Sequence, residues 1–250
     1  MAHFLDQLNE AQRKAAMQTE GPVMVIAGAG SGKTRVLTFR IAYLLEKGVD
    51  AFNILSLTFT NKAAREMKER IGKMVGDSEA KNLWMGTFHS VFARILRSEA
   101  EKLGYPTNFT IYDADDAKKV VTNIIKEKNL DKEIYKAKGV TSRISSLKNN
   151  LITPKAYFQN GELQAQDSSA KMPMFGEIYQ AYCERCFRAG CMDFDDLLLK
   201  TNELMYKFPD VLAKYQARFK YILVDEYQDT NHSQYLIVKA LAAKYENICI

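Results

Sequence analysis

A glycine-rich segment that ends in Lys33 and Thr34 has the residue types of a phosphate-binding loop. Its eight residues are Ala27, Gly28, Ala29, Gly30, Ser31, Gly32, Lys33 and Thr34, and Ala27 stands where the strict pattern has its first glycine. The segment follows the apolar run 23–26 and precedes a helical pattern over 34–46, the strand–turn–helix order that such loops require. Glycines let backbone N–H groups turn towards an anion, and the helix adds its N-terminal amides. We therefore expect Lys33 to contact the β- and γ-phosphates of a nucleotide and the Thr34 hydroxyl to bind Mg²⁺.

Two carboxylates at the end of another apolar run are candidates for the second half of this site. Asp225 and Glu226 directly follow residues 222–224, Ile-Leu-Val. Asp225 would hold Mg²⁺, directly or through water, and Glu226 would orient and deprotonate the attacking water. Ligands of open parallel sheets bind at the carboxyl edge, so we expect both segments to emerge there from neighbouring strands. The alternative is a pair of solvated carboxylates at a turn.

The composition is that of a folded chain with a mild basic excess. The chain has 250 residues, of which 47% are hydrophobic, and a formal net charge of +5. This length suffices for one large domain or two small ones, and the charge permits nucleic-acid binding without requiring it. No apolar run approaches the ~18 residues of a membrane span, and residues 1–10 lack the pattern of a signal peptide. We therefore expect a soluble, cytoplasmic protein that does not contact a membrane.

Three of the four cysteines are close together in the sequence. Cys183, Cys186 and Cys191 cluster, whereas Cys249 lies apart, and none of the three histidines is near the cluster. Zinc needs a fourth ligand, and two of the cysteines lie in a helical pattern over 174–189. We expect buried free thiols, with a metal or iron–sulfur site as the alternative.

Short apolar runs alternate with helical patterns along most of the chain. The expected strands are residues 23–26, 54–59, 83–85, 221–224 and 247–250, and the expected helices are 9–18, 34–47, 62–75, 89–103 and 233–244. This alternation predicts an α/β fold with a parallel sheet, whose buried strands are continuous apolar runs. The run 247–250 resembles a strand that has only begun, so we expect the chain to be a fragment of a longer protein.

The middle of the chain, residues 113–189, shows helical patterns and few strand signals. Asp113 is expected to cap a helix that continues to Ile125, whereas Pro154 and the polar stretch 159–169 interrupt the pattern. We interpret this part as a mostly helical insertion. Residues 126–148 hold seven Lys and Arg against three acidic residues, which indicates either a solvated helix face or a surface that faces DNA.

Over nearly its whole length the chain strongly resembles superfamily 1 DNA helicases of the UvrD/PcrA/Rep type. Residues 27–35, Ala-Gly-Ala-Gly-Ser-Gly-Lys-Thr-Arg, have that family's form of the glycine loop, so Ala27 is no departure from it. Residues 8–13, Leu-Asn-Glu-Ala-Gln-Arg, are similar to the family's Q motif, which implies that Gln12 reads the adenine edge. The alternative is an ordinary capped first helix. Arg35 matches an arginine that contacts the base, and a guanidinium can stack on adenine, although a surface salt bridge is the alternative.

Two further segments resemble the DNA-contacting motifs Ia and Ib of this family. The segment 57–64, Leu-Thr-Phe-Thr-Asn-Lys-Ala-Ala, is similar to motif Ia, with Phe59 as a stacking face and Thr60, Asn61 and Lys62 near phosphates. Alternatively, Asn61 only caps the helix and Phe59 belongs to the core. The segment 86–90, Gly-Thr-Phe-His-Ser, resembles motif Ib and implies DNA contacts from Thr87 and His89, with a purely structural role for His89 as the alternative.

The resemblance extends to residues 193–198, Asp-Phe-Asp-Asp-Leu-Leu, and 225–230, Asp-Glu-Tyr-Gln-Asp-Thr. In the second segment Gln228 is a candidate sensor of the γ-phosphate. Asp229 or Thr230 is expected to cap the following helix, with Asp229 the first choice. The implied architecture is a RecA-like P-loop domain over residues 1–108 and 192–250, with a mostly helical accessory subdomain over 109–191.

The resemblance also implies an activity. The full-length protein would be an ATP- and Mg²⁺-dependent helicase or translocase on single-stranded and tailed duplex DNA, with 3′-to-5′ polarity, in repair or replication. This fragment alone would turn over ATP very slowly and unwind nothing, because the second RecA-like domain and its arginines would be missing. A helicase-like subunit of a recombination helicase–nuclease, or a module that binds ATP and DNA without turnover, are the alternatives.

Overall fold

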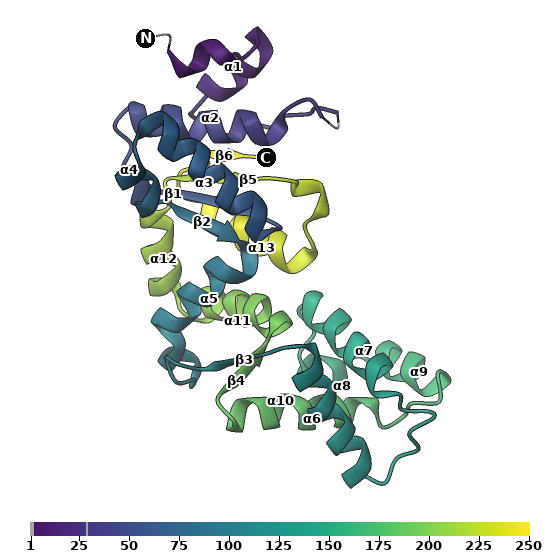
Figure 1. Cartoon of the computed structure of the whole chain (residues 1–250). Helices are drawn as coiled ribbons and strands as arrows, with labels where there is room; N and C mark the ends of the chain where they lie inside the picture. The colour runs from purple at the N-terminus through teal and green to yellow at the C-terminus, as the bar shows by residue number, and fades with distance from the viewer. Residues whose placement is uncertain (1–2, 29) are drawn as a thin grey trace. The chain divides into compact units, whose positions relative to one another are not determined.

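The computed structural model describes residues 3–28 and 30–250 (Figure 1). Its helices of more than one turn are α1 (Glu10–Met17), α2 (Lys33–Glu46), α3 (Asn61–Val75), α4 (Asp77–Asn82), α5 (Phe88–Glu99), α6 (Ala114–Glu127), α7 (Ala137–Asn149), α8 (Pro154–Phe158), α9 (Gly161–Ser169), α10 (Phe175–Arg188), α11 (Phe194–Lys207), α12 (Pro209–Arg218) and α13 (His232–Ala242). Its strands are β1 (Ile54–Thr58), β2 (Trp84–Thr87), β3 (Thr110–Tyr112), β4 (Cys191–Asp193), β5 (Tyr221–Val224) and β6 (Ile248–Cys249). The same described residues also form the 3-10 helices η1 (Phe4–Gln7), η2 (Ala51–Asn53), η3 (Ala100–Leu103) and η4 (Tyr227–Asp229).

The chain divides into two compact units. The first consists of Met1–Val91, Met205–Thr230 and Gln234–Ile250, and the second of Phe92–Leu204 and Asn231–Ser233. The predicted accessory subdomain, residues 109–191, lies within the second unit, and its limits stay a prediction.

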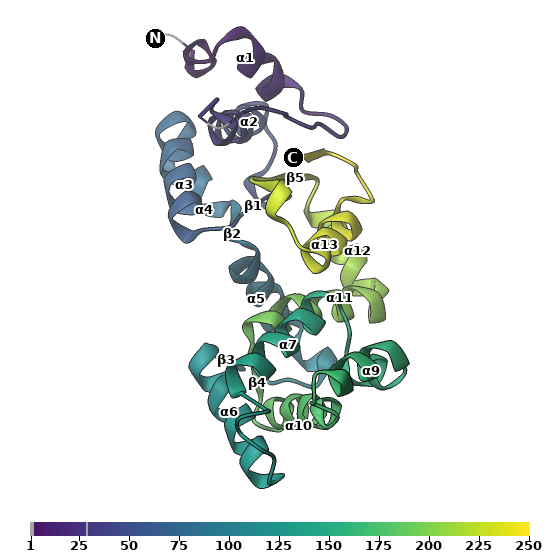
Figure 2. The same cartoon turned by 90° about the vertical axis from the view of Figure 1, so that its right-hand side faces the viewer.

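A parallel sheet forms the centre of the first unit, in the strand order β2-β1-β5-β6. Apolar residues of α2 and α3 pack on this sheet in one buried cluster with Leu223 of β5 and Cys249 of β6. Figure 2 shows α3 and α4 on one side of the strands and α13 on the other. The predicted α/β fold with a parallel sheet is therefore confirmed. The apolar runs indicated it because strands covered on both faces are largely apolar.

The expected strand over residues 23–26 is wrong in part. Only Val23 forms a bridge, to Cys249, and the side chains of Met24 and Ile26 are exposed. The partner strand β6 is only two residues long, so the pairing between residues 23–26 and β6 is short. This segment also neighbours β6 rather than β5, which corrects the expectation that the two halves of the site leave neighbouring strands.

The predicted helices of the first unit form with bounds close to those expected. Asn9 caps α1 in a capping box with Gln12, and Thr60 caps α3 by accepting a hydrogen bond from the Ala63 N–H group. Because Thr60 is the cap, Asn61 is the first residue of α3 and does not cap it. A capping side chain satisfies a backbone N–H group that has no partner within the helix.

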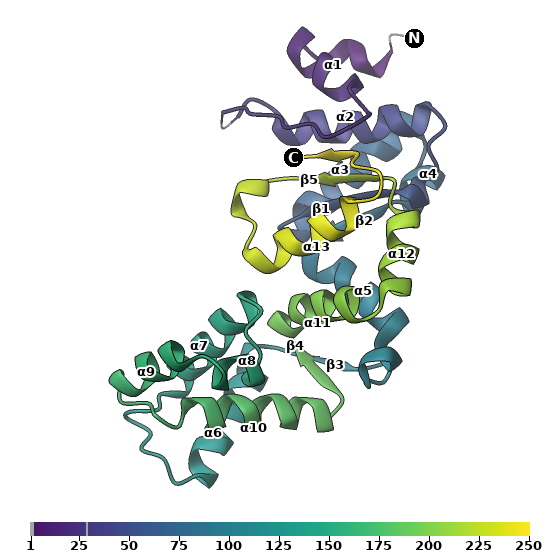
Figure 3. The same ribbon diagram turned by 180° about the vertical axis from the view of Figure 1, so that it is seen from behind.

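The second unit is mostly helical, as expected (Figure 3), and α10 packs against α6 and α8 in its core. Its core joins residues of α6, α7, α8 and α10, among them Ile124, Ile144, Tyr157 and Tyr179. Asp113 caps α6 as predicted. Pro154 does not interrupt a helix but starts α8, since proline is accepted at the first helical position, and residues 161–169 form α9. The two-stranded parallel sheet of β3 and β4 was not predicted.

All four cysteines are free thiols. Cys186 is buried and Cys183 half-buried on α10, and burial raises the pKa of both thiols to about 12. Within residues 3–28 and 30–250 no cluster of three or more His, Cys, Asp or Glu has the arrangement of a metal site. In the same residues no helix is both long and apolar enough to cross a membrane.

One basic residue of the segment 126–148 is an exception to both interpretations of that segment, which otherwise stay predictions. Lys148 is fully buried, and its ammonium group lies 2.7 Å from Asp193 and 2.8 Å from Asp196. It therefore belongs neither to a solvated face nor to a surface that faces DNA.

Candidate functional site

The glycine-rich loop turns tightly before α2. Gly30 and Gly32 have φ angles of 75° and 87°, in the left-handed region that favours glycine. The Ser31 hydroxyl and N–H group both donate to the Gly28 carbonyl oxygen, at 2.6 and 3.2 Å. The helix begins at Lys33, so its first N–H groups point towards the loop. Ala29 lies outside the described residues.

Lys33 closes this loop with its side chain. Its Nζ atom donates to the carbonyl oxygens of Ala27 and Gly28, at 3.1 and 3.3 Å. An ammonium group has three donors and turns freely, so it can exchange a carbonyl oxygen for a phosphate oxygen. The predicted cation is thus placed at the loop, although its contact with a nucleotide stays a prediction.

The two halves of the predicted site meet at Thr34 and Asp225, 191 residues apart in the sequence. The Thr34 hydroxyl donates to the Asp225 carboxylate at 3.0 Å. Asp225 is only 4% exposed, and its N–H group donates to the Leu57 carbonyl oxygen, which fixes it at the end of β5. Burial raises the pKa of Asp225, while the hydrogen bond from Thr34 acts in the opposite direction.

This pair fits a magnesium ion. Neighbouring ligands of an octahedral Mg²⁺ lie about 3 Å apart when each Mg–O distance is about 2.1 Å. The two oxygen atoms of Thr34 and Asp225 have this separation already. Hydroxyl and carboxylate oxygens are also the hard ligands that Mg²⁺ prefers.

Glu226 follows directly in a strained backbone conformation. Its φ and ψ angles are 52° and 44°, in the left-handed region that non-glycine residues rarely adopt. Its carboxylate accepts a hydrogen bond from the Gln228 side-chain amide. Asp229 lies in η4, and α13 begins at His232, so neither Asp229 nor Thr230 directly precedes that helix. The predicted capping by these two residues is therefore wrong.

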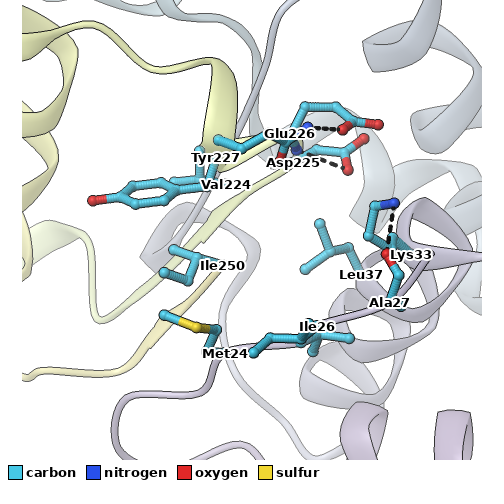
Figure 4. Close-up of a pocket in the computed structure, with 12 residues that line it drawn as sticks. Met24, Ile26, Ala27, Lys33, Leu37, Val224, Asp225, Glu226, Tyr227 and Ile250 are labelled. Carbon is cyan, nitrogen blue, oxygen red and sulfur yellow. Dashed lines mark hydrogen bonds between the residues drawn. The ribbon is translucent and has the colours of Figure 1, made fainter. Parts of the chain in front are cut away.

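A pocket of about 380 Å³ lies against these groups. Its lining consists of Met24, Val25, Ile26, Ala27, Lys33, Leu37, Val224, Asp225, Glu226, Tyr227, Gln228 and Ile250. Figure 4 shows Lys33, Asp225 and Glu226 together at one end, with apolar side chains at the other. Tyr227 on the pocket wall was not predicted, although its place within the Asp-Glu segment was a signal that could have found it.

The predicted adenine-binding residues are engaged with the protein. Gln12 donates to the Ser31 carbonyl oxygen at 3.0 Å and accepts from the Asn9 N–H group, which is its part in the capping box. Arg35 donates to the Gln7 carbonyl oxygen at 2.8 Å and lies over the Phe39 ring. Both side chains lie beside the loop, and their contact with a base stays a prediction.

The predicted DNA-contacting residues come together at one edge of the sheet. β1 and β2 end in register, with Thr58 opposite Thr87. Phe59 therefore lies beside Phe88, with 5.4 Å between the ring centroids. Thr60, Asn61 and Lys62 are exposed around the start of α3, and His89 is half-buried at the start of α5. The Thr87 hydroxyl accepts a hydrogen bond from the Ser90 N–H group.

Comparison with known proteins assigns the chain to a family. Residues 8–250 match the family described as the UvrD/REP helicase N-terminal domain. The chain belongs to this family. It is 47% identical over 251 aligned residues to the ATP-dependent DNA helicase PcrA of Staphylococcus aureus (strain Mu50), with all of the chain and 33% of the relative covered. It is 46% identical to the protein of the same name from Staphylococcus epidermidis, of which it covers 34%.

As a member of the UvrD/REP family the chain has a mixed α/β fold with parallel strands, and the predicted resemblance is confirmed. The chain spans about a third of the length of the curated relatives it matches.

Proposed function

We propose that the chain is the ATP-binding domain of a DNA helicase or translocase that hydrolyses ATP with Mg²⁺. The observation that carries this proposal is the 3.0 Å contact between the hydroxyl of Thr34 and the carboxylate of Asp225. It joins the glycine-rich loop to the Asp-Glu segment in one site. The membership in the UvrD/REP family supports the same conclusion.

Each residue of the site has a proposed role in hydrolysis. Backbone N–H groups of residues 28–34 and the Lys33 ammonium group would bind the phosphates. Thr34 and Asp225 would hold Mg²⁺, which neutralises charge on the phosphates when bound. Glu226 would orient water and accept its proton, and Gln228 would sense the γ-phosphate after releasing the Glu226 carboxylate. Gln12 and Arg35 would contact the adenine.

The aligned ends of β1 and β2 support binding of single-stranded DNA. Phe59 is only partly buried there and can offer its aromatic face to bases of any sequence, whereas its neighbour Phe88 is buried and can only support the Phe59 ring. Thr60, Asn61, Lys62, Thr87 and His89 lie on the segments that follow these two strand ends, where they would contact phosphates and bases. We propose single-stranded and tailed duplex DNA as partners, 3′-to-5′ movement, a role in repair or replication, and a cytoplasmic location.

The length of the relatives bears on how much this chain does alone. The chain covers about a third of them, so we propose that further domains complete the ATP site in the full-length protein. An arginine supplied from another domain is worth ~10³–10⁵ in rate in related phosphoryl-transfer systems. The chain alone would then bind nucleotide, hydrolyse it very slowly and unwind nothing.

The contact between Thr34 and Asp225 is tested by Thr34→Val, which keeps the shape of the side chain and removes the hydroxyl. Affinity for a fluorescent ATP analogue is measured on this chain with Mg²⁺ and with chelator. We expect the wild type to gain at least about tenfold from Mg²⁺ and the variant to lose most of that gain.

Thr38→Val is the matched control, one turn further along α2. Its hydroxyl bonds to the Thr34 carbonyl oxygen within the helix, so its loss is expected to leave the Mg²⁺ effect intact. An unchanged Mg²⁺ effect in Thr34→Val would show that the two segments do not form a shared metal site.

A further inference from the structure

The Asp-Glu segment ends in a turn that is stiffened by its own hydrogen bonds. The Asp229 N–H group donates to the Glu226 carbonyl oxygen at 3.0 Å. The N–H group and the hydroxyl of Thr230 both donate to the Tyr227 carbonyl oxygen, at 3.1 and 2.8 Å. The turn therefore moves as one piece, and its orientation depends on where its two ends are attached.

This turn follows strand β5 of the sheet, and its C-terminal end leads into Asn231–Ser233. These three residues belong to the second compact unit, so the chain passes between units just after Thr230. Within the second unit, Asn231 donates to the Asn149 side-chain oxygen at 2.7 Å. Asn202 donates to the carbonyl oxygen of Ser233 at 3.1 Å and to its hydroxyl at 2.9 Å.

The side-chain amide of Asn149 makes hydrogen bonds through both its oxygen and its nitrogen. Its oxygen accepts from Asn231, while its nitrogen donates to the Asp195 carboxylate at 2.8 Å and to the Ser145 carbonyl oxygen at 2.9 Å. Asp195 lies in the first turn of α11, beside Phe194, which is 54% exposed. A shift of Asp195 would thus pull on Asn149 and through it on Asn231.

This attachment matters because of the backbone at Glu226. A left-handed conformation of a non-glycine residue is strained and persists only where the surroundings hold it. At Glu226 the constraint comes from β5 on one side and from the stiffened turn on the other. Hydrogen bonds that hold the far end of that turn would therefore help to keep the Glu226 carboxylate in its orientation.

We propose that Asn149 is a positioning residue for ATP hydrolysis, which acts through Asn231 on the turn that carries Glu226. This rests on the proposed function of Glu226. Asn149 touches neither nucleotide nor water in this role. Through this amide the second unit would influence the rate of hydrolysis, because a displacement of Asp195 would weaken the hydrogen bond between Asn149 and Asn231.

Two substitutions can exchange the donor and the acceptor of the hydrogen bond between Asn149 and Asp195, and this exchange tests the proposal. Asn149→Asp keeps an oxygen that can accept from Asn231, but it places two carboxylates face to face, so repulsion breaks the contact with Asp195 and turns the side chain away from its place beside Asn231. The double variant with Asp195→Asn restores a donor and an acceptor in exchanged positions, with unchanged net charge. Asn150→Asp is the control, because this neighbouring residue is exposed and its side-chain amide donates to the Ser146 carbonyl oxygen of its own helix turn.

Amide hydrogen exchange on this chain measures how firmly the far end of the turn is held. We expect Asn149→Asp to raise exchange across residues 228–231, the double variant to restore protection, and Asn150→Asp to leave it unchanged. Equal protection in all four proteins would overturn the proposal.

Steady-state ATP turnover of the full-length protein measures the consequence. We expect Asn149→Asp to lower kcat about tenfold with KM for ATP unchanged, and the double variant to recover most of the loss. A fall that follows thermal stability and is not rescued would indicate a structural role only. An unchanged kcat in Asn149→Asp, with turnover still dependent on Glu226, would refute the positioning role and leave the proposed function standing. Turnover that does not need Glu226 would refute both.

Discussion

At the scale of single residues, the proposed ATP site depends on side chains that are far apart in the sequence and on glycines that shape the loop before Thr34. Thr34 meets Asp225 across 191 positions. Gly32 allows this, because it turns the chain into α2 with a φ angle of 87°. A Cβ atom at Gly32 would also lie 3.0 Å from the side-chain nitrogen of Gln12.

Gly32→Ala is therefore expected to lower the free energy of unfolding by about 1–2 kcal/mol and to weaken nucleotide binding. Gly28→Ala is the control, since its φ angle is not positive and its Cβ atom would meet open space. That variant is expected to stay within about 0.5 kcal/mol of the wild type. Urea denaturation compares the two, and equal losses would contradict the strain at Gly32.

The residues of the site were more predictable than their contacts. Lys33, Thr34, Asp225 and Glu226 follow from motifs whose chemistry needs those residue types. The hydrogen bonds of Gln12 to Ser31 and of Gln228 to Glu226 could not be predicted, because they depend on rotamers and on backbone carbonyls brought close by the fold.

At the scale of elements, the register of the sheet decides which loops share an edge. Thr58 lies opposite Thr87, and Leu57 lies opposite Val224, so β1, β2 and β5 end together. The loops that follow these strands carry the candidate DNA residues and the Asp-Glu segment. Lys62 is well placed to reach a phosphate, because its side chain is 79% exposed and its contact with Glu66 is long, at 4.0 Å.

Lys62→Ala is expected to weaken binding of a single-stranded oligonucleotide and to lower the slope of log affinity against log salt by about 0.7, the effect of one phosphate contact. Lys73→Ala is the control, on an exposed position in the last turn of the same helix. Fluorescence anisotropy at several salt concentrations measures both. The same slope in Lys62→Ala as in the wild type would exclude this contact.

Most apolar strands and amphipathic helices were predictable, while β3, β4, α8 and α9 were not. β3 and β4 have three residues each, too few for a pattern, and they form only because distant parts of the chain pair. Helices α8 and α9 are held by the caps Thr153 and Asn160, whereas polar composition had suggested an interruption.

At the scale of the whole molecule, a buried ion cluster joins α7 to the start of α11 in the second unit. Burial by itself lowers the pKa of Lys148, but the carboxylates of Asp196 and Asp193 raise it well above its usual value. Burial raises the pKa of Asp193, but Lys148 and the Tyr182 hydroxyl lower it more. For Asp196 burial prevails, and its pKa is raised.

Lys148→Met would leave two buried carboxylates without their cation, at an expected cost of about 3–5 kcal/mol in the free energy of unfolding near pH 7. The sign of the pH dependence should then differ from that of the wild type. The lowered pKa of Asp193 makes the wild type lose stability as the pH falls through that value. In the variant both pKa values rise, so protonation relieves the repulsion and the deficit should shrink towards about pH 5.

Urea denaturation near pH 7 and pH 5 checks this expectation, with Lys138→Met as a control at an exposed position of the same helix. A deficit that is the same at both values would show that the carboxylates do not need the Lys148 charge.

The central claim is that one site, formed by the glycine-rich loop and the Asp-Glu segment, hydrolyses ATP with Glu226 as the base. The most direct test is Glu226→Gln in the full-length protein, with ATP affinity and DNA-stimulated turnover measured side by side. We expect affinity to stay within about threefold of the wild type and kcat to fall by at least about 10²-fold. Turnover near the wild-type rate in this variant would contradict the account.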